Sequence, residues 1–226
     1  MRLRKQWTGN CGALFVITIC CLLAVTTVNA QSKKTAQQTA SLENAGESAK
    51  SGVQDALNAL RDLLAGYNSI IGGEVKDTQA AYKKLVSNLK GTEKTIEGAK
   101  KQLTALSKEA DKFFKAWEQD LASMSSDSVR EKSANRMETA KKRYASIGET
   151  LSQAGDEFAP VVQELNDQIL FLGRDLSPEA VADLQDEAEA LNQQATEVAA
   201  RVKELLQSAG KEQAEADAEL DDSSGE

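Results

Sequence analysis

The feature that most constrains this chain is an apolar repeat that runs through its centre without interruption. Apolar or small residues follow one another at alternating steps of three and four positions from Val75 to Trp117. They are Val75, Thr78, Tyr82, Leu85, Leu89, Thr92, Ile96, Ala99, Leu103, Leu106, Ala110, Phe113 and Trp117. A repeat that averages about 3.5 residues keeps one stripe of a helix facing a partner helix, whereas a strand needs a repeat of about two. The pattern therefore predicts one long helix in a coiled-coil-like bundle.

Three further apolar repeats with similar spacing flank this one. Together they predict four helices, near residues 41–71, 74–124, 128–172 and 178–210. Proline distorts a helix interior, and the chain contains only 2 prolines. Because the apolar repeat of the third helix continues past Pro160, we expect a kink or a local break beside it rather than a helix end.

The connections between the predicted helices carry turn and cap residues. Gly72 and Gly73 can adopt the left-handed backbone that ends a helix. Ser177 directly precedes Pro178, which predicts a helix with serine as N-cap and proline as its first residue. Short connections of this kind make neighbouring helices antiparallel.

The fold class that follows is all-α: an elongated antiparallel coiled-coil bundle of four helices, with a two-helix arm protruding from one end. At ~1.5 Å per residue the second helix is roughly 75 Å long, and the first and fourth are each nearer to roughly 50 Å. Both shorter helices extend from the same end of the bundle, the one marked by Gly72 and Pro178. The second and third helices are therefore expected to be uncovered over about residues 107–146, where the shorter helices do not reach.

Three rings crowd into this arm, although the chain is only 4% aromatic. One interpretation is packing, because large rings bury more area where only two helices close a seam. The other is contact with a partner, for which exposed aromatic and methionine side chains are suited. The candidate contact surface consists of Phe113, Phe114, Trp117, Leu121 and Met124. Phe114 lies off the seam and is expected to be the least buried ring.

The segment "NDQILFL" (166–172) places Asp167 and Gln168 beside an apolar run. An acid with no partner base in view does not indicate catalysis. Polar residues in helical seams can instead fix the register of neighbouring helices. We therefore expect a buried polar contact in this segment.

Residues 1–30 have the pattern of a signal peptide. Basic residues precede an uncharged apolar stretch (11–28), and the small residues of "VNA" favour cleavage before Gln31. A stretch of 18 apolar residues could also stay in place as a membrane anchor, which is the alternative. We predict export to the periplasm or the cell envelope.

The domain organisation follows from this segment and the four helices. Polar composition predicts a flexible N-terminal segment at 31–40 and an acidic disordered tail at 211–226. The helical coiled-coil domain is expected to occupy 41–210 between them.

The composition removes several kinds of functional site. All 3 cysteines lie in the predicted signal peptide, at Cys11, Cys20 and Cys21, and the chain has no histidine. Thiolate and imidazole chemistry are therefore excluded from the exported chain. No spacing typical of a calcium loop, a nucleotide-binding loop or a serine hydrolase appears. We predict no catalytic, cofactor-binding or metal-ligating residues, and a protein that is not an enzyme.

The charge of the chain argues against nucleic acid as a partner. The formal net charge is −8, and no cluster of basic residues is present in residues 31–226. An acidic surface repels a phosphate backbone, so we expect no nucleic-acid binding.

Four ordered segments of the sequence resemble one family. They are "FFKAWEQDL" (113–121), "RY" (143–144), "PVVQELNDQILFL" (160–172) and "AVADLQDE" (180–187). Together they resemble a bacterial group of exported helical proteins, the domain of unknown function 2959, over most of residues 45–210. The resemblance implies export and a helical fold, and it implies no activity. Where the family tends to have a Lys-His-Asn-Leu-Asn turn, this chain has "GRDLSPE" (173–179), so no role of that histidine is carried over.

The function expected from these features is that of a non-catalytic, exported coiled-coil scaffold or adaptor that acts through protein–protein contacts. Its protein partner is unknown and includes the chain itself as one option. One alternative is a periplasmic holdase-like chaperone, although the acidity of the chain speaks mildly against it. The other alternative is a membrane-associated envelope protein, held at the membrane through the aromatic arm or through an uncleaved apolar stretch 11–28.

Overall fold

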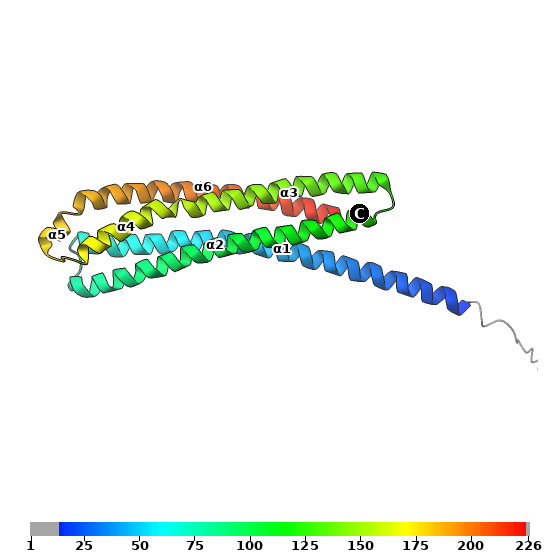
Figure 1. Cartoon of the computed structure of the whole chain (residues 1–226), viewed down its shortest axis with the longest axis horizontal. Helices are drawn as coiled ribbons and strands as arrows, with labels where there is room; N and C mark the ends of the chain where they lie inside the picture. The colour runs from blue at the N-terminus through cyan, green and yellow to red at the C-terminus, as the bar shows by residue number, and fades with distance from the viewer. Residues whose placement is uncertain (1–13, 225–226) are drawn as a thin grey trace, which may run out of the picture. The chain divides into compact units, whose positions relative to one another are not determined.

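The computed structural model describes residues 14–224, and over this range the chain is all-α without a strand (Figure 1). Its helices are α1 (Leu14–Ile71), α2 (Thr78–Ser123), α3 (Asp127–Asp156), α4 (Phe158–Leu172), α5 (Pro178–Ala182) and α6 (Gln185–Ser224). The chain divides into two compact units, residues 1–40 and 41–226. The bundle described below belongs to the second unit. The predicted all-α class is confirmed.

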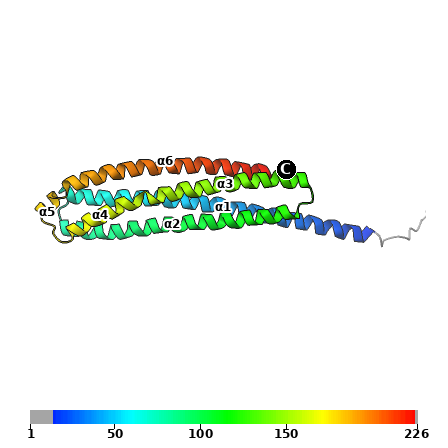
Figure 2. The same ribbon diagram turned by 45° about the horizontal axis from the view of Figure 1, so that its top comes forward.

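Within this unit, α2 lies along α3, and α3 in turn lies along α6 (Figures 1 and 2). The α1–α2 turn, α5 and the first turn of α6 gather at one end, which we call the loop end. The opposite end is formed by the last turns of α2 and the first turns of α3, and we call it the hairpin end. The candidate contact residues of α2 belong to the hairpin end.

The helix boundaries at the loop end follow the predicted turn chemistry. Gly73 has a φ of 69°, the left-handed conformation that glycine adopts most easily. Asp77 caps α2, where its Oδ1 accepts a hydrogen bond from Ala80 N at 2.9 Å. Ser177 caps α5 in the same way through Ala180 N, and Pro178 is the first helical residue as expected.

Two short breaks interrupt the second half of the chain. The predicted break beside Pro160 is confirmed, because α3 ends at Asp156 and α4 begins at Phe158, with Glu157 between them. A further break between α5 and α6 was not expected from the sequence. Leu184 lies in it with only 7% of its surface exposed, so the turn places an apolar side chain in the core.

The expected helix bounds are corrected at both ends of the chain. Helix is present at 31–40 and at 211–224, where polar composition predicts flexible or disordered chain. Residues 31–40 are rich in Gln, Lys and Ala, residues 211–224 are rich in Ala and Glu, and neither segment contains Pro or Gly, so helix propensity favours continuation of α1 and α6. The last two residues of the predicted acidic tail, 225–226, lie outside the described residues.

The core is built from the predicted apolar seams. Fully or almost fully buried residues include Leu85 and Leu106 of α2, Ile147 of α3, Leu165 of α4 and Val202 of α6. Because each belongs to a repeat of three and four, these four helices turn one stripe inward over the residues whose side chains are described. The core is thus continuous along the bundle.

Residues 33–214 are those whose side chains the structure describes. Among them, no helix combines the length and the apolar character that crossing a bilayer requires. Residues 1–13, which contain the basic part of the predicted signal peptide, are not described at all. The signal peptide at 1–30 therefore stays a prediction.

Candidate functional site

The rings predicted as a contact surface form one cluster at the hairpin end. Phe113 lies edge-on to Phe114 and to Trp117, with ring centroids 5.3 and 5.8 Å apart. Phe114 also meets Tyr144 of α3 edge-on at 6.2 Å. Edge-to-face geometry brings the positive rim of one ring toward the negative face of the next, which stabilises the cluster.

Three of the five candidate residues lie in the core. Phe113, Phe114 and Leu121 have exposed fractions of 6%, 4% and 9%. The prediction that Phe114 is the least buried ring is wrong, because Tyr144 covers the side of α2 next to the seam. These three side chains pack the hairpin end, and little of their surface is left for a partner.

The other two candidates, Trp117 and Met124, are half-buried against the core. Trp117 Nε1 donates a hydrogen bond to Ser133 Oγ at 2.9 Å, which ties α2 to α3. Arg130 Nη1 donates to the backbone oxygen of Met124 at 3.0 Å across the α2–α3 turn. The Trp117 side chain and the Met124 backbone therefore also stabilise the hairpin, and these two residues are the candidates that keep open surface.

A groove between α2 and α3 begins beside these rings. Its first part is a cavity of about 460 Å³ with Phe114 and Tyr144 in its lining. A second cavity of about 330 Å³ continues it, and the two share Ser107 and Gly148. We call the combined feature the α2–α3 groove, which runs from the level of Lys100 on α2 to the level of Glu118.

Ion pairs cross the α2–α3 groove at both of its ends. Lys100 Nζ lies 3.5 Å from Asp156 Oδ1, and Lys141 Nζ lies 3.7 Å from Glu118 Oε1. Each of the four side chains is at least half exposed. Exposed pairs of this kind contribute little to stability, so their charges remain open to an additional partner.

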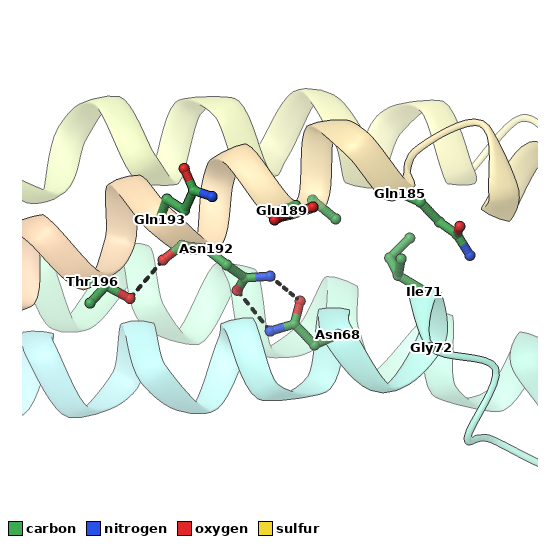
Figure 3. Close-up of a pocket in the computed structure, with 9 residues that line it drawn as sticks. Asn68, Ile71, Gly72, Gln185, Glu189, Asn192, Gln193 and Thr196 are labelled. Atoms are coloured by element: carbon green, nitrogen blue, oxygen red, sulfur yellow. Dashed lines mark hydrogen bonds between the residues drawn. The ribbon is translucent and has the colours of Figure 1, made fainter.

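A second groove lies between α1 and α6 near the loop end (Figure 3). It is a cavity of about 450 Å³ whose lining includes Gln185, Glu189 and Gln193. The side-chain amides of Asn68 and Asn192 exchange two hydrogen bonds in it, at 2.8 and 2.9 Å. Because these amides satisfy each other, the pair is suited to fixing the register of α1 against α6 and leaves few free groups for a ligand.

A buried polar chain lies next to that pair. The Tyr67 hydroxyl of α1 donates to Gln168 Oε1 of α4, and Gln168 Nε2 donates to Glu164 Oε1 at 3.0 Å. Tyr67 is fully buried and Gln168 is 5% exposed, so the polar contact expected in "NDQILFL" is confirmed at Gln168. Burial raises the pKa of the Tyr67 hydroxyl far above its ordinary value, and the charges of Glu187 and Glu164 raise it further.

Several of the other ion pairs join neighbouring turns of a single helix. Lys101 and Glu97, for example, lie 2.7 Å apart one turn from each other, and the hydrogen bond and charge of Lys101 lower the pKa of Glu97. No three acidic side chains among the described residues converge as metal ligands would. The arrangement is thus suited to helix association, and neither groove contains a nucleophile paired with a base.

Several of these residues were not identified from the sequence. Asn68 and Asn192 each lie one position from a seam residue, which is a weak signal for an interhelical pair. Leu170 and Phe171 are two of the large apolar residues that stay exposed, at 59% and 44%. They lie in the apolar run of "NDQILFL". Four consecutive apolar residues cannot all lie on the buried face of a helix, so the sequence does signal that some of them stay exposed.

Comparison with known proteins adds a family. The sequence profile of the family described as "Protein of unknown function (DUF2959)" matches residues 29–218. This match confirms the resemblance seen in four segments of the sequence. Neither a curated protein nor a solved structure matches the chain.

Proposed function

We propose that this chain, which belongs to the DUF2959 family of proteins of unknown function, is a non-catalytic scaffold or adaptor that acts through protein–protein contacts. The observation that carries the proposal is the α2–α3 groove, an open surface of two connected cavities beside the ring cluster. Helical surfaces of this kind receive other helices, because side chains of one helix fit between those of another. The absence of histidine from the sequence and of cysteine from residues 31–226 supports a role without catalysis.

The finer architecture that we propose is an elongated antiparallel coiled-coil bundle of four long rods. In this arrangement α3 and α4 together form one rod. The two-helix arm expected at the hairpin end, over about residues 107–146, is shortened, because α6 continues to Ser224 instead of ending near residue 210. The α2–α3 groove lies beside that end, so a partner could approach it from the side. Coiled-coil character is supported by the unbroken repeat from Val75 to Trp117.

The compartment that we propose is the bacterial cell envelope. The basic start and the apolar stretch 11–28 support export, and "VNA" supports cleavage before Gln31. N-terminal sequencing of the protein recovered from cells tests this, with a start at Gln31 expected. A start at Met1 would instead support a chain that stays anchored in the membrane.

That anchored form is a second candidate, because α1 runs without a break from Leu14 to Ile71. Most of the apolar stretch therefore belongs to the same helix as the seam that begins at Leu42. Carbonate extraction of membranes separates the two forms, since an anchored chain stays in the pellet and a cleaved chain is released.

The contact role is tested by photo-crosslinking in cells. A probe replaces Ala145, an exposed residue in the α2–α3 groove, and a matched probe replaces Lys203, an exposed residue of α6 outside it. We expect a discrete crosslinked protein from position 145 and none from position 203. Equal, diffuse labelling at both positions, or no product at either, would contradict the proposal.

A further inference from the structure

We propose that the α2–α3 groove is the docking surface for a second copy of this same chain. The inference rests on the proposed contact role and names the partner. It is argued from the shape of the groove, from the spacing of its residues and from the arrangement of its charges.

The groove has room for another helix. Gly148 lies where the two cavities meet, and a Cβ atom added to it would have no neighbour within 4 Å. Ser107, Ala110 and Ala145 line the groove near it with small side chains. Small residues at a helix surface allow the backbone of another helix to approach closely.

The residues that line the groove recur with helical spacing. On α2 they include Lys100, Thr104, Ser107, Asp111, Phe114 and Glu118, and on α3 they include Lys141, Ala145, Gly148, Ser152 and Asp156. Steps of three and four keep each row on one side of its helix over several turns. The groove is therefore a straight surface that suits a rod rather than a small molecule.

The charges at its ends form an alternating square. Lys100 of α2 and Asp156 of α3 occupy one end, whereas Glu118 of α2 and Lys141 of α3 occupy the other. The sign thus changes both along each helix and across the groove. A square of this kind is complementary to itself, which is the property that a two-fold symmetric interface requires.

Two symmetric arrangements satisfy all four corners. If the copies run antiparallel, Lys100 faces Glu118 of the second copy and Lys141 faces its Asp156. If the copies run parallel, each lysine faces the acid that it already pairs with in its own chain, now in the second copy. A second copy carries the four complementary charges at the required positions by symmetry, whereas a partner of unrelated sequence would have to carry them independently. The pattern therefore favours a second copy.

Each arrangement also brings like charges together, because Asp111 and Glu149 line the middle of the groove. The antiparallel arrangement places each of these two acids near the same residue of the second copy. The parallel arrangement brings Asp111 toward Glu149 and Lys115 toward Lys141 of the second copy. These contacts therefore do not favour one orientation of the dimer over the other.

The size of the groove determines how tightly the copies bind. From Lys100 to Glu118 it extends over roughly 27 Å at ~1.5 Å per residue, and a pair of helices is roughly 20 Å wide. Such a face buries on the order of 1,000 Å² in total over both copies, which is the lower limit for a specific interface. We therefore expect a dimer that dissociates on dilution.

The first test compares two glycine variants of the full chain by sedimentation in density-matched mild detergent. Gly148→Gln places a long side chain in the groove, while Gly98→Gln makes the same change at a glycine of α2 that does not line the groove and is equally free of neighbours. Both substitutions raise helix propensity, so neither is expected to unfold the chain. We expect dimerisation to weaken on the order of tenfold or more for Gly148→Gln and to stay unchanged for Gly98→Gln.

The second test reverses one charge. Lys141→Glu creates a like-charge contact in either arrangement, whereas Lys101→Glu makes the same charge change and loses the pair with Glu97 outside the groove. Dimerisation should weaken for Lys141→Glu only. The pair swap Lys100→Glu with Asp156→Lys then keeps the ion pair within the chain and assigns the orientation: it disrupts an antiparallel dimer and leaves a parallel dimer intact.

The proposal is overturned if the wild-type chain stays monomeric at its highest soluble concentration. It is also overturned if Gly148→Gln and Gly98→Gln dimerise like the wild type, because association would then use another surface. Neither result would remove the broader contact role. A crosslinked product at position 145 in cells that is a protein other than this chain would still support that role.

Discussion

The loop end and the hairpin end of the bundle are held together by different kinds of contact. At the loop end, Tyr67 bonds to Gln168 and Asn68 bonds to Asn192, so α1 is tied to α4 and α6 by directional hydrogen bonds. At the hairpin end, Phe114 and Tyr144 meet through ring packing, and a hydrogen bond from Trp117 to Ser133 also joins α2 to α3. Hydrogen bonds between fixed pairs are satisfied in one register only, whereas ring contacts tolerate small shifts.

This difference indicates a division of roles along the bundle. The loop end specifies how the helices align, because a slip by one turn would leave Gln168 Oε1 and the two half-buried asparagine amides without their interhelical partners. The hairpin end relies more on ring packing, and it borders the open α2–α3 groove.

The largest effect is expected at the hairpin end. Phe114→Ala removes a ring that is 4% exposed and should lower the free energy of unfolding by about 3 kcal/mol, since a buried ring is lost and a cavity remains. Urea unfolding followed by circular dichroism measures this change. The matched control is Leu170→Ala, whose side chain is 59% exposed and whose loss should cost less than ~0.5 kcal/mol. Similar losses for both variants would mean that the ring cluster is not a core.

At the loop end a smaller loss is expected. Tyr67→Phe removes one hydroxyl and leaves Gln168 Oε1 buried without its donor, which should cost about 1–2 kcal/mol. The double variant Tyr67→Phe with Gln168→Leu should recover much of the loss, because no polar group then stays unpaired. If the loss in the double variant equals the sum of the losses in the two single variants, the two residues act independently and the register role is wrong.

Alkaline pH should weaken the loop end selectively. The pKa of Tyr67 is raised in the folded chain, so above about pH 10 the unfolded chain releases a proton that the folded chain keeps. The stabilisation is thus complete below about pH 10 and is lost as the pH rises, by about 1.4 kcal/mol per pH unit. Unfolding at pH 8 and at pH 11 measures the loss, and Tyr67→Phe should show a smaller one. Equal pH dependence in both proteins would show that Tyr67 titrates normally.

Much of the fold could be predicted because the responsible signals are local. The repeat from Val75 to Trp117 identifies α2, and Ser177 with Pro178 identifies the start of α5. The break before Pro160 follows from the geometry of proline itself. Each of these signals lies within a few residues of the structure that it determines.

The remaining features depend on which helices become neighbours. Phe114 lies off the seam, and its burial results from Tyr144 on another helix. Asn68 and Asn192 are 124 positions apart, so their pairing depends on the register of α1 and α6. The α2–α3 groove likewise exists only once two helices are placed side by side. A single sequence contains no direct signal for these distances.

The smallest predicted effect is a gain in stability at the groove. Gly148→Ala should raise the free energy of unfolding by about 0.5–1 kcal/mol, because alanine favours helix and the added methyl has no neighbour within 4 Å. Gly52→Ala is the matched contrast on α1. There the same methyl would overlap the Gln102 side chain and lie 3.2 Å from Ala99 Cα, so the gain in propensity is offset by strain between α1 and α2. The urea midpoint should rise for Gly148→Ala and should not rise for Gly52→Ala, and a lower midpoint for Gly148→Ala would mean that the groove is closed in the folded chain.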